Sequence, residues 1–150
     1  MPTTEAARWV WQPDADKIEQ WNGPAPAEDV ELKTEVERAK GMLAGSSELD
    51  DGGAPYSQAT LDRAIAFVRV HSAKGHSLCG YYPPAPRIGL GPDGSIDLHW
   101  KQSKWELLVN VPSDDSQVAV FYGDDYGVAK IRGSFDPKTV NLGIVNWLMH

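Results

Sequence analysis

Three titratable side chains are placed to act together on one face of a predicted sheet. Asp97 and His99 alternate along one predicted strand, and Glu106 begins the next. A connection of four residues, 101–104, predicts a register with His99 opposite Glu106, where a carboxylate can orient the imidazole as a general base. Such a base also needs a nucleophile or a bound substrate, and no motif supplies one. The alternative, which we favour, is a solvent-facing cross-strand pair worth well under ~1 kcal/mol.

Other chemical signatures are weak or missing in the sequence. It contains no glycine-rich phosphate loop, no Cys/His metal spacing and no serine nucleophile elbow. The loop 46–54 holds Glu48, Asp50 and Asp51, but their spacing does not match an EF-hand, so we interpret it as a solvated loop. The single cysteine, Cys79, excludes an intramolecular disulfide and is predicted to be a buried, inert thiol. We therefore assign no catalytic residue, no metal site and no cofactor, and the sequence argues against an enzyme.

The composition sets the broad class of the protein. The chain has 150 residues, of which 41% are hydrophobic and 23% charged, as in a soluble globular domain. No apolar run is long enough to cross a membrane, and the first residues do not read as a signal peptide, so we expect a cytoplasmic protein. The net charge of -7 argues against direct nucleic-acid binding and is compatible with a protein partner that has a basic surface.

The N-terminal region combines tryptophans with several prolines. Trp9, Trp11 and Trp21 lie in this segment, which is too rich in proline to form a stable isolated helix. One interpretation is an extended arm whose indole rings pack onto the body of the protein. The other is an arm that anchors a partner, because tryptophan is frequent at binding hot spots. Packing is the interpretation we favour, since exposed tryptophan is unusual without a partner.

Two helices are predicted before the sheet. Apolar residues recur at helical spacing over 27–44, and again over 57–73 where Ser57 is suited to the N-cap. Gly75 is expected to end the second helix. His71, near that end, is predicted to lie at the surface.

Residues 86–132 are predicted to form an antiparallel meander of about five strands. The register of its central hairpin places Trp100 opposite Trp105. The strand over 117–122 has apolar residues on both faces, so its register stays open. Asp136, followed by proline, is predicted to cap a final helix.

A tight turn is expected inside the meander, where proline is followed by Asp93 and Gly94.

The predicted fold class is α+β: an antiparallel β-meander of about five strands with helices packed on one face and an N-terminal helical, Trp-rich extension. Residues 1–45 are assigned to the arm and first helix, and residues 46–150 to an α+β core domain.

Two stretches of the chain carry distinctive motifs. They are Leu49–Ser57, with its Gly-Ala-Pro-x-Ser helix start, and Pro86–Trp100, with its Pro…Asp-Gly…Leu-x-Trp strands. With these motifs the chain resembles a group of small uncharacterised bacterial proteins of mobile genetic islands. Some members of this group lie near toxin–antitoxin or phage-defence genes, an association that implies no chemistry. The chain departs from the group at Leu49, where the pattern has Trp, and at His99, where it has Glu. The second departure removes the acidic group best suited to a shared role.

These observations lead to one functional expectation and two alternatives. The leading expectation is a non-enzymatic protein-binding module, an antitoxin-like, inhibitory or accessory subunit of a toxin or phage-defence system. The residues expected to contact the partner are tryptophans: Trp9, Trp11, Trp21, Trp100 and Trp105. The first alternative is an enzyme or small-ligand binder that uses the His99 and Glu106 face together with Asp97. The second is an acidic mimic of nucleic acid.

Overall fold

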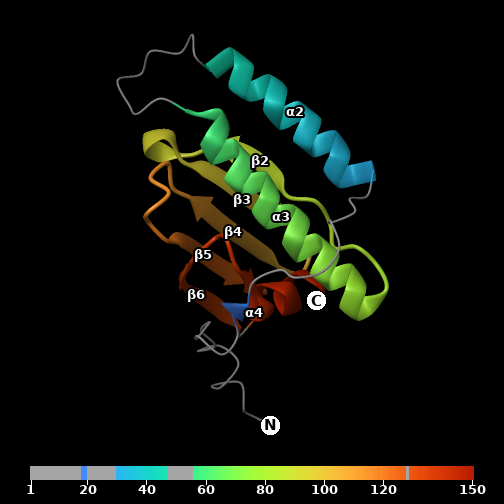
Figure 1. The fold of residues 1–150 in the computed structure, drawn as a ribbon. Helices are drawn as coiled ribbons and strands as arrows, with labels where there is room; N and C mark the ends of the chain where they lie inside the picture. The colour runs from blue at the N-terminus through green and yellow to red at the C-terminus, as the bar shows by residue number, and fades with distance from the viewer. Residues whose placement is uncertain (1–17, 20–29, 47–55, 128) are drawn as a thin grey trace.

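The computed structural model describes residues 18–19, 30–46, 56–127 and 129–150 of the chain. Its fold is α+β, as predicted, with the helices on one face of an antiparallel sheet (Figure 1). The helices are α2 (Val30–Ser46), α3 (Gln58–Cys79) and α4 (Leu142–Leu148). The strands are β1 (Ile18–Glu19), β2 (Arg87–Leu90), β3 (Ile96–Lys101), β4 (Glu106–Val111), β5 (Ala119–Asp124), β6 (Lys130–Phe135) and β7 (Val140–Asn141).

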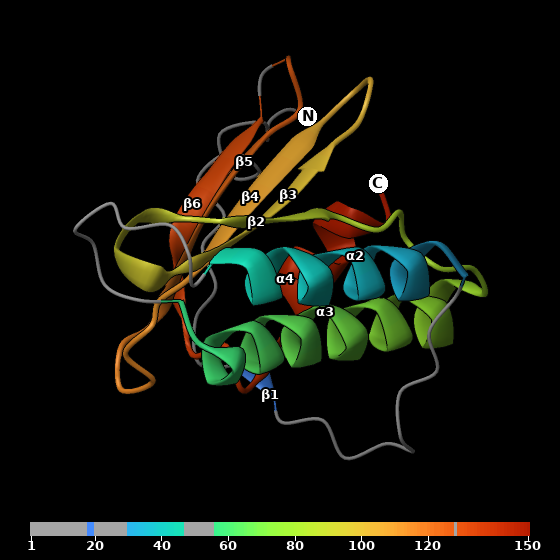
Figure 2. The ribbon, with the colours of Figure 1, turned by 90° about the horizontal axis from the view of Figure 1, so that it is seen from above.

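The main sheet has five strands in the order β2-β3-β4-β5-β6, so each strand pairs with its neighbour in the chain. This order confirms the predicted meander. Seen from above, α2 and α3 form a layer on one side of the sheet (Figure 2). The short strands β1 and β7 pair with each other in a separate antiparallel ladder.

Alternation along the strands builds the core. On β3 and β4, the side chains that face the helices are fully buried, and they meet the apolar stripe of α3. The open question about the strand after residue 116 is also resolved, because Ala119 and Phe121 are buried while Val120 and Tyr122 are exposed. Burying each large apolar side chain stabilises the fold by about 1.5–3 kcal/mol.

Helix α2 contributes to the same core as the sheet. Its four buried residues repeat at helical spacing, as the sequence predicted: Leu32, Val36, Ala39 and Leu43. Its last residue, Ser46, lies two residues beyond the predicted end. The predicted division of the chain near residue 45 stays a prediction.

Helix α3 is longer than predicted, and the surface position predicted for His71 is wrong. The helix passes through Gly75 and ends at Cys79, and Gly80, with a φ of 85°, forms its left-handed cap. A Cβ at Gly75 would lie 2.6 Å from the Sδ of Met149, so this glycine serves close packing. His71 continues the buried stripe three residues after Val68 and is fully buried.

The central hairpin has a register two residues away from the predicted one. Trp100 lies opposite Leu107, and Lys101 lies opposite Glu106. The reason is a tighter turn, in which the Gln102 N–H donates to the Trp105 carbonyl at 2.8 Å. A shift of two residues leaves every side chain on its predicted face.

The predicted turn after β2 is confirmed, but the predicted helix cap at Asp136 is wrong. Asp93 and Gly94 have φ values of 55° and 78°, as an Asp-Gly turn requires. The Asp136 carboxylate instead accepts the Lys138 N–H at 2.9 Å and closes a turn. The chain then pairs through β7 before Asn141 caps α4. None of the helices in the described part of the chain is long and apolar enough to cross a membrane.

Candidate partner-binding face

The sheet face turned away from the helices carries a continuous row of side chains, and we call it the open face. The row crosses all five strands because the register pairs these residues in order: Arg87, His99, Leu108, Tyr122 and Arg132. Its centre is hydrophobic and accessible, with Leu108 37%, Val120 50% and Tyr122 41% exposed. The same strands bury their other faces under the helices, so the two faces of the sheet differ sharply.

His99 and Glu106 meet on the open face, as predicted. The imidazole Nε2 lies 2.8 Å from the Glu106 Oε2, although the two residues are diagonal rather than directly opposite. The hydrogen bond from His99 lowers the pKa of Glu106, against the opposing effect of its partial burial, and Lys101 lowers it further. The hydrogen bond therefore fixes the two side chains as a half-exposed polar pair at the edge of the hydrophobic centre.

Tyr126 belongs to this group and was missed by the sequence reasoning. It has a φ of 61°, unusual for a bulky residue. The Asp124 carboxylate accepts the Tyr126 N–H at 2.8 Å, and Asp125 accepts the N–H groups of Gly127 and Ala129. These bonds hold a half-exposed aromatic ring close enough to Glu106 for its hydroxyl to lower the pKa of that carboxyl. The Asp-Asp-x-Gly pattern was the available signal.

Asp97 does not join the His99 pair. Its Oδ1 accepts a hydrogen bond from the Asn110 Nδ2 at 2.8 Å, and the same amide donates to the Ser95 Oγ. Gly91 packs against this cluster, and a Cβ there would lie 2.5 Å from the Ser95 Oγ. The Asp97 carboxylate therefore fixes the turn between β2 and β3, which is a structural role.

The structure corrects the assignment of Trp100 and Trp105 as partner contacts. Their side chains are only 1% and 5% exposed, on the helix side of the sheet. The Trp100 indole N–H donates to the Pro84 carbonyl at 2.9 Å. Both rings belong to the core because their strand positions point under the helices. The three N-terminal tryptophans lie outside the described residues: Trp9, Trp11 and Trp21.

The predicted buried position of Cys79 is also wrong, because this thiol is exposed. It lies at the end of α3, on the layer opposite the open face. Within the described ranges, no group of three or more His, Cys, Asp or Glu side chains is placed to hold a metal ion. The described part of the open face offers an oriented imidazole beside apolar and aromatic side chains, an arrangement suited to recognition.

Comparison with models of protein families, with curated proteins and with solved structures found no match to this chain.

Proposed function

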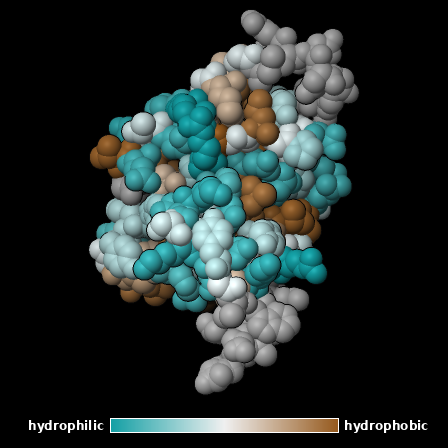
Figure 3. Space-filling model, turned by 180° about the vertical axis from the view of Figure 1, so that it is seen from behind, coloured by the Kyte–Doolittle hydropathy of each residue, from teal (hydrophilic) through white to brown (hydrophobic). Residues whose placement is uncertain are grey.

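We propose that the protein is a non-enzymatic protein-binding module that uses the open face of its sheet. The observation that carries this proposal is the exposed hydrophobic centre formed by Leu108, Val120 and Tyr122. Polar and charged residues surround it, among them His99 and Arg132. An apolar centre with a polar rim, rich in tyrosine and arginine, is typical of protein–protein interfaces. From the side opposite the helices, apolar areas lie within a mostly polar surface (Figure 3).

The proposed role is that of an antitoxin-like, inhibitory or accessory subunit. Its support is the resemblance to proteins of mobile islands, some of which lie near toxin–antitoxin or phage-defence genes. The natural partner is then the product of a neighbouring gene. The proposal places this complex in the cytoplasm, where an exposed thiol such as Cys79 stays reduced.

The net charge of the protein is unevenly distributed along the sequence. Residues 1–29 carry six acidic and two basic side chains, and residues 47–55 carry three acidic and no basic ones. The remaining residues, 30–46 and 56–150, are electrically balanced, so the whole net charge of -7 comes from those two segments. A basic partner surface would therefore be met by residues 1–29 and 47–55, which carry the excess acidic side chains. The balanced body offers no support for the alternative of a nucleic-acid mimic, which needs a dense acidic face.

A matched pair of leucine variants tests the proposed face. Leu108 is 37% exposed on the open face, and Leu78 is 61% exposed on α3, in the opposite layer. The partner is identified by pull-down from the native host, purified and titrated with the full-length chain. Leu108→Asp is expected to weaken binding by about 2 kcal/mol or more, roughly thirtyfold, because it places a charge in the hydrophobic centre. Leu78→Asp is expected to bind like the unmodified chain.

Two further variants separate the remaining interpretations. Replacing Trp9, Trp11 and Trp21 with serine tests whether the N-terminal arm anchors the partner. Replacing His99 and Glu106 with alanine tests the alternative of an enzyme or small-ligand site on the same face. Equal binding by Leu108→Asp and Leu78→Asp, with both variants folded, would contradict the proposed face.

A further inference from the structure

Among the described residues, no strand pairs with the outer edge of β6. The Asp125 N–H donates to the Ala129 carbonyl at 3.1 Å, so these two residues form a hydrogen-bonded pair at the start of the β5–β6 ladder. Hydrogen-bonded pairs alternate along an antiparallel ladder, so Ile131 and Gly133 direct their backbone groups toward β5. Lys130 and the other alternate residues of β6 must then direct theirs away from the sheet.

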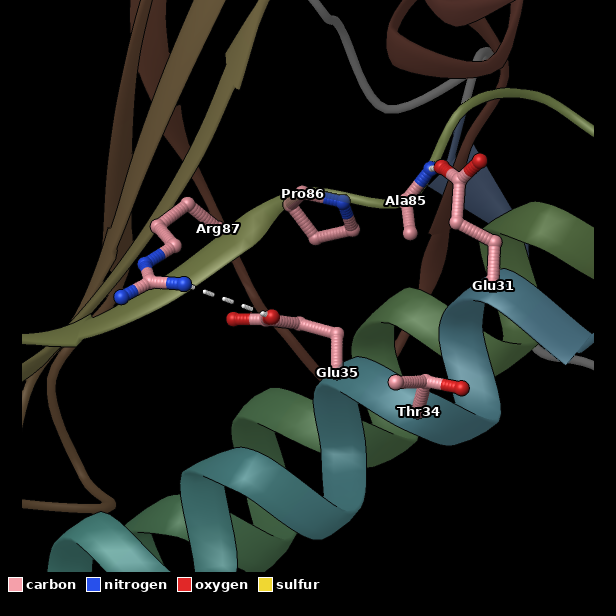
Figure 4. A pocket seen from close by; sticks show the side chains of 6 residues that line it. All are labelled: Glu31, Thr34, Glu35, Ala85, Pro86 and Arg87. Atoms are coloured by element: carbon pink, nitrogen blue, oxygen red, sulfur yellow. Dashed lines mark hydrogen bonds and ion pairs between the residues drawn. The ribbon is translucent and has the colours of Figure 1, made fainter.

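The same rule is verified at the opposite edge of the sheet. There the Gly91 N–H donates to the Ser95 carbonyl, so the alternation turns the backbone of Ile88 outward. The structure shows this arrangement directly: the Glu35 carboxylate accepts the Ile88 N–H at 2.8 Å, and Arg38 donates to the Ile88 carbonyl. Figure 4 shows Glu35 reaching from α2 toward β2.

No such cover exists at β6 within the described residues. Its outward backbone groups belong to three exposed residues, Lys130, Arg132 and Ser134. None of them forms a hydrogen bond outside the β5–β6 ladder in the described part of the chain. An exposed edge of this kind is a template for another strand.

The side chains beside this edge indicate what kind of strand fits. Lys130 and Arg132 project onto the open face, and among the described residues neither forms an ion pair. Asp124 lies opposite Lys130 in the ladder, but no ion pair joins them. Acidic side chains on a neighbouring strand would lie beside these two cations, where opposite charges stabilise the pairing.

The helix side of the same edge offers a pocket. It has a volume of about 160 Å³ and is lined by Ile131 of β6 together with Asn146, Trp147 and His150 at the C-terminal helix. Side chains on a strand alternate between faces, so an added strand with acidic residues on one face has its other residues beside this pocket. The Ile131 and Trp147 lining suits an apolar side chain.

We infer that β6 accepts an extended segment of the partner protein as a sixth strand, with acidic and apolar side chains in alternation. A second copy of this chain is a poor occupant. Antiparallel pairing of two β6 strands about Arg132 would set the two Arg132 side chains against each other, and like charges directly opposite are destabilising. This inference deepens the proposed function and depends on it for the source of the strand.

The test is a nuclear magnetic resonance titration of the full-length chain with a short synthetic peptide in which glutamate and valine alternate. Binding is expected to shift the amide signals of Lys130, Arg132 and Ser134 and to slow their hydrogen exchange. A peptide with lysine in place of glutamate is the control. Ser134→Pro is expected to weaken binding about tenfold, because it removes an outward N–H while keeping both cations and the β5 ladder.

Three outcomes would overturn the inference. They are equal binding of the lysine peptide, shifts confined to other strands, and slow exchange of the three amides before any peptide is added. The last would mean that the chain itself, or a second copy, already covers the edge. If the peptide binds at β6 but Leu108→Asp leaves partner binding unchanged, the proposed use of the open face is contradicted and the added strand is not. If the peptide does not bind at β6 but Leu108→Asp weakens partner binding, only the added strand is contradicted.

Discussion

The two edges of the sheet have opposite surroundings. At β2, the side chains of α2 take the place of a neighbouring strand: Glu35 and Arg38 bind the N–H and carbonyl of Ile88. At β6, the outward backbone groups have no partner among the described residues. One side of this fold is therefore closed by its own helices, and the other side is where we propose that another protein adds a strand.

The two faces of the sheet differ in the same way. The helix face buries Trp100 almost completely, and the open face leaves Tyr122 41% exposed. We call the helix face and the β2 edge the closed side, and the open face and the β6 edge the open side. The closed side accounts for stability, and we assign binding to the open side.

The largest expected effect comes from removing a core side chain on the closed side. Trp100→Ala should lower the free energy of unfolding by about 3–5 kcal/mol, because it leaves a cavity and frees the Pro84 carbonyl. Tyr122→Ala, on the open face, should cost less than ~1 kcal/mol. Urea unfolding measures both values. Equal losses in the free energy of unfolding of the two variants would contradict the assignment of stability to the closed side.

Acid should weaken the closed side through His71. This ring bridges α3 and β7, with its Nδ1 at 2.9 Å from the Phe67 carbonyl and its Nε2 accepting the Asn141 N–H at 3.0 Å. Burial lowers the pKa of His71 from 6.5 to about 4, so folding favours the neutral ring. The contribution of neutral His71 to the free energy of unfolding is complete above pH 6.5 and is lost as the pH falls toward 4. The total loss is on the order of 3 kcal/mol.

His71→Phe isolates this acid dependence. The variant should lose about 1–3 kcal/mol at pH 7, because the buried Asn141 N–H loses its acceptor. Between pH 6.5 and 4 its stability should then fall less than that of the unmodified chain. Urea unfolding at both ends of this range provides the test. Parallel curves for the two proteins would show that His71 does not carry the effect.

A smaller effect is expected at the capped β2 edge. Glu35→Ala should cost about 1–3 kcal/mol, because it leaves the Ile88 N–H without an acceptor. Burial alone would raise the pKa of Glu35, but Arg38 and the Ile88 N–H hold it below its usual value. The contribution of ionised Glu35 to the free energy of unfolding is therefore complete at pH values above the ordinary carboxyl pKa. It is lost as the pH falls through the lowered pKa of Glu35.

In the Glu35→Ala variant, the β2 edge loses this cap and should also promote self-association. Analytical ultracentrifugation detects self-association as a concentration-dependent rise in mass. Glu37→Ala, on the exposed surface of the same helix, is the control and should change stability by less than ~0.5 kcal/mol. If both variants behave alike, α2 does not protect the edge.

The smallest change in stability is expected at Tyr126. Tyr126→Gly relieves the positive φ of 61° at the cost of chain entropy, so the free energy of unfolding should change by no more than ~1 kcal/mol. Partner affinity should nevertheless fall, because the aromatic ring is lost from the open side. Tyr126→Asn, which also tolerates this backbone conformation, should repeat the loss. Full affinity in both variants would place the interface elsewhere.

Much of the fold could be predicted from local patterns. Alternation identified the buried faces of β3 and β4, and Asp93-Gly94 identified a turn with positive φ. The contact between His99 and Glu106 was also predicted, because a register shift of two residues keeps both side chains on one face.

The errors arose where distant packing decides the structure. Gly75 reads as a helix stop, but the neighbouring Met149 requires its small size inside α3. His71 reads as a surface residue, but β7 supplies a hydrogen bond that makes its burial possible. The open β6 edge could not be recognised from the sequence, because it depends on where the helices pack. The positive φ of Tyr126 was missed because it depends on several hydrogen bonds from the Asp124 and Asp125 side chains, which act together in the turn.

Hydrogen exchange of the full-length chain, measured free and bound to its purified partner, tests the central claim most directly. Binding on the open side should slow exchange in residues 120–124 and 130–134. It should leave the amides of α2 and that of Ile88 unchanged, since Glu35 already protects the latter. Slowed exchange confined to α2 and α3, with β5 and β6 unchanged, would contradict the account.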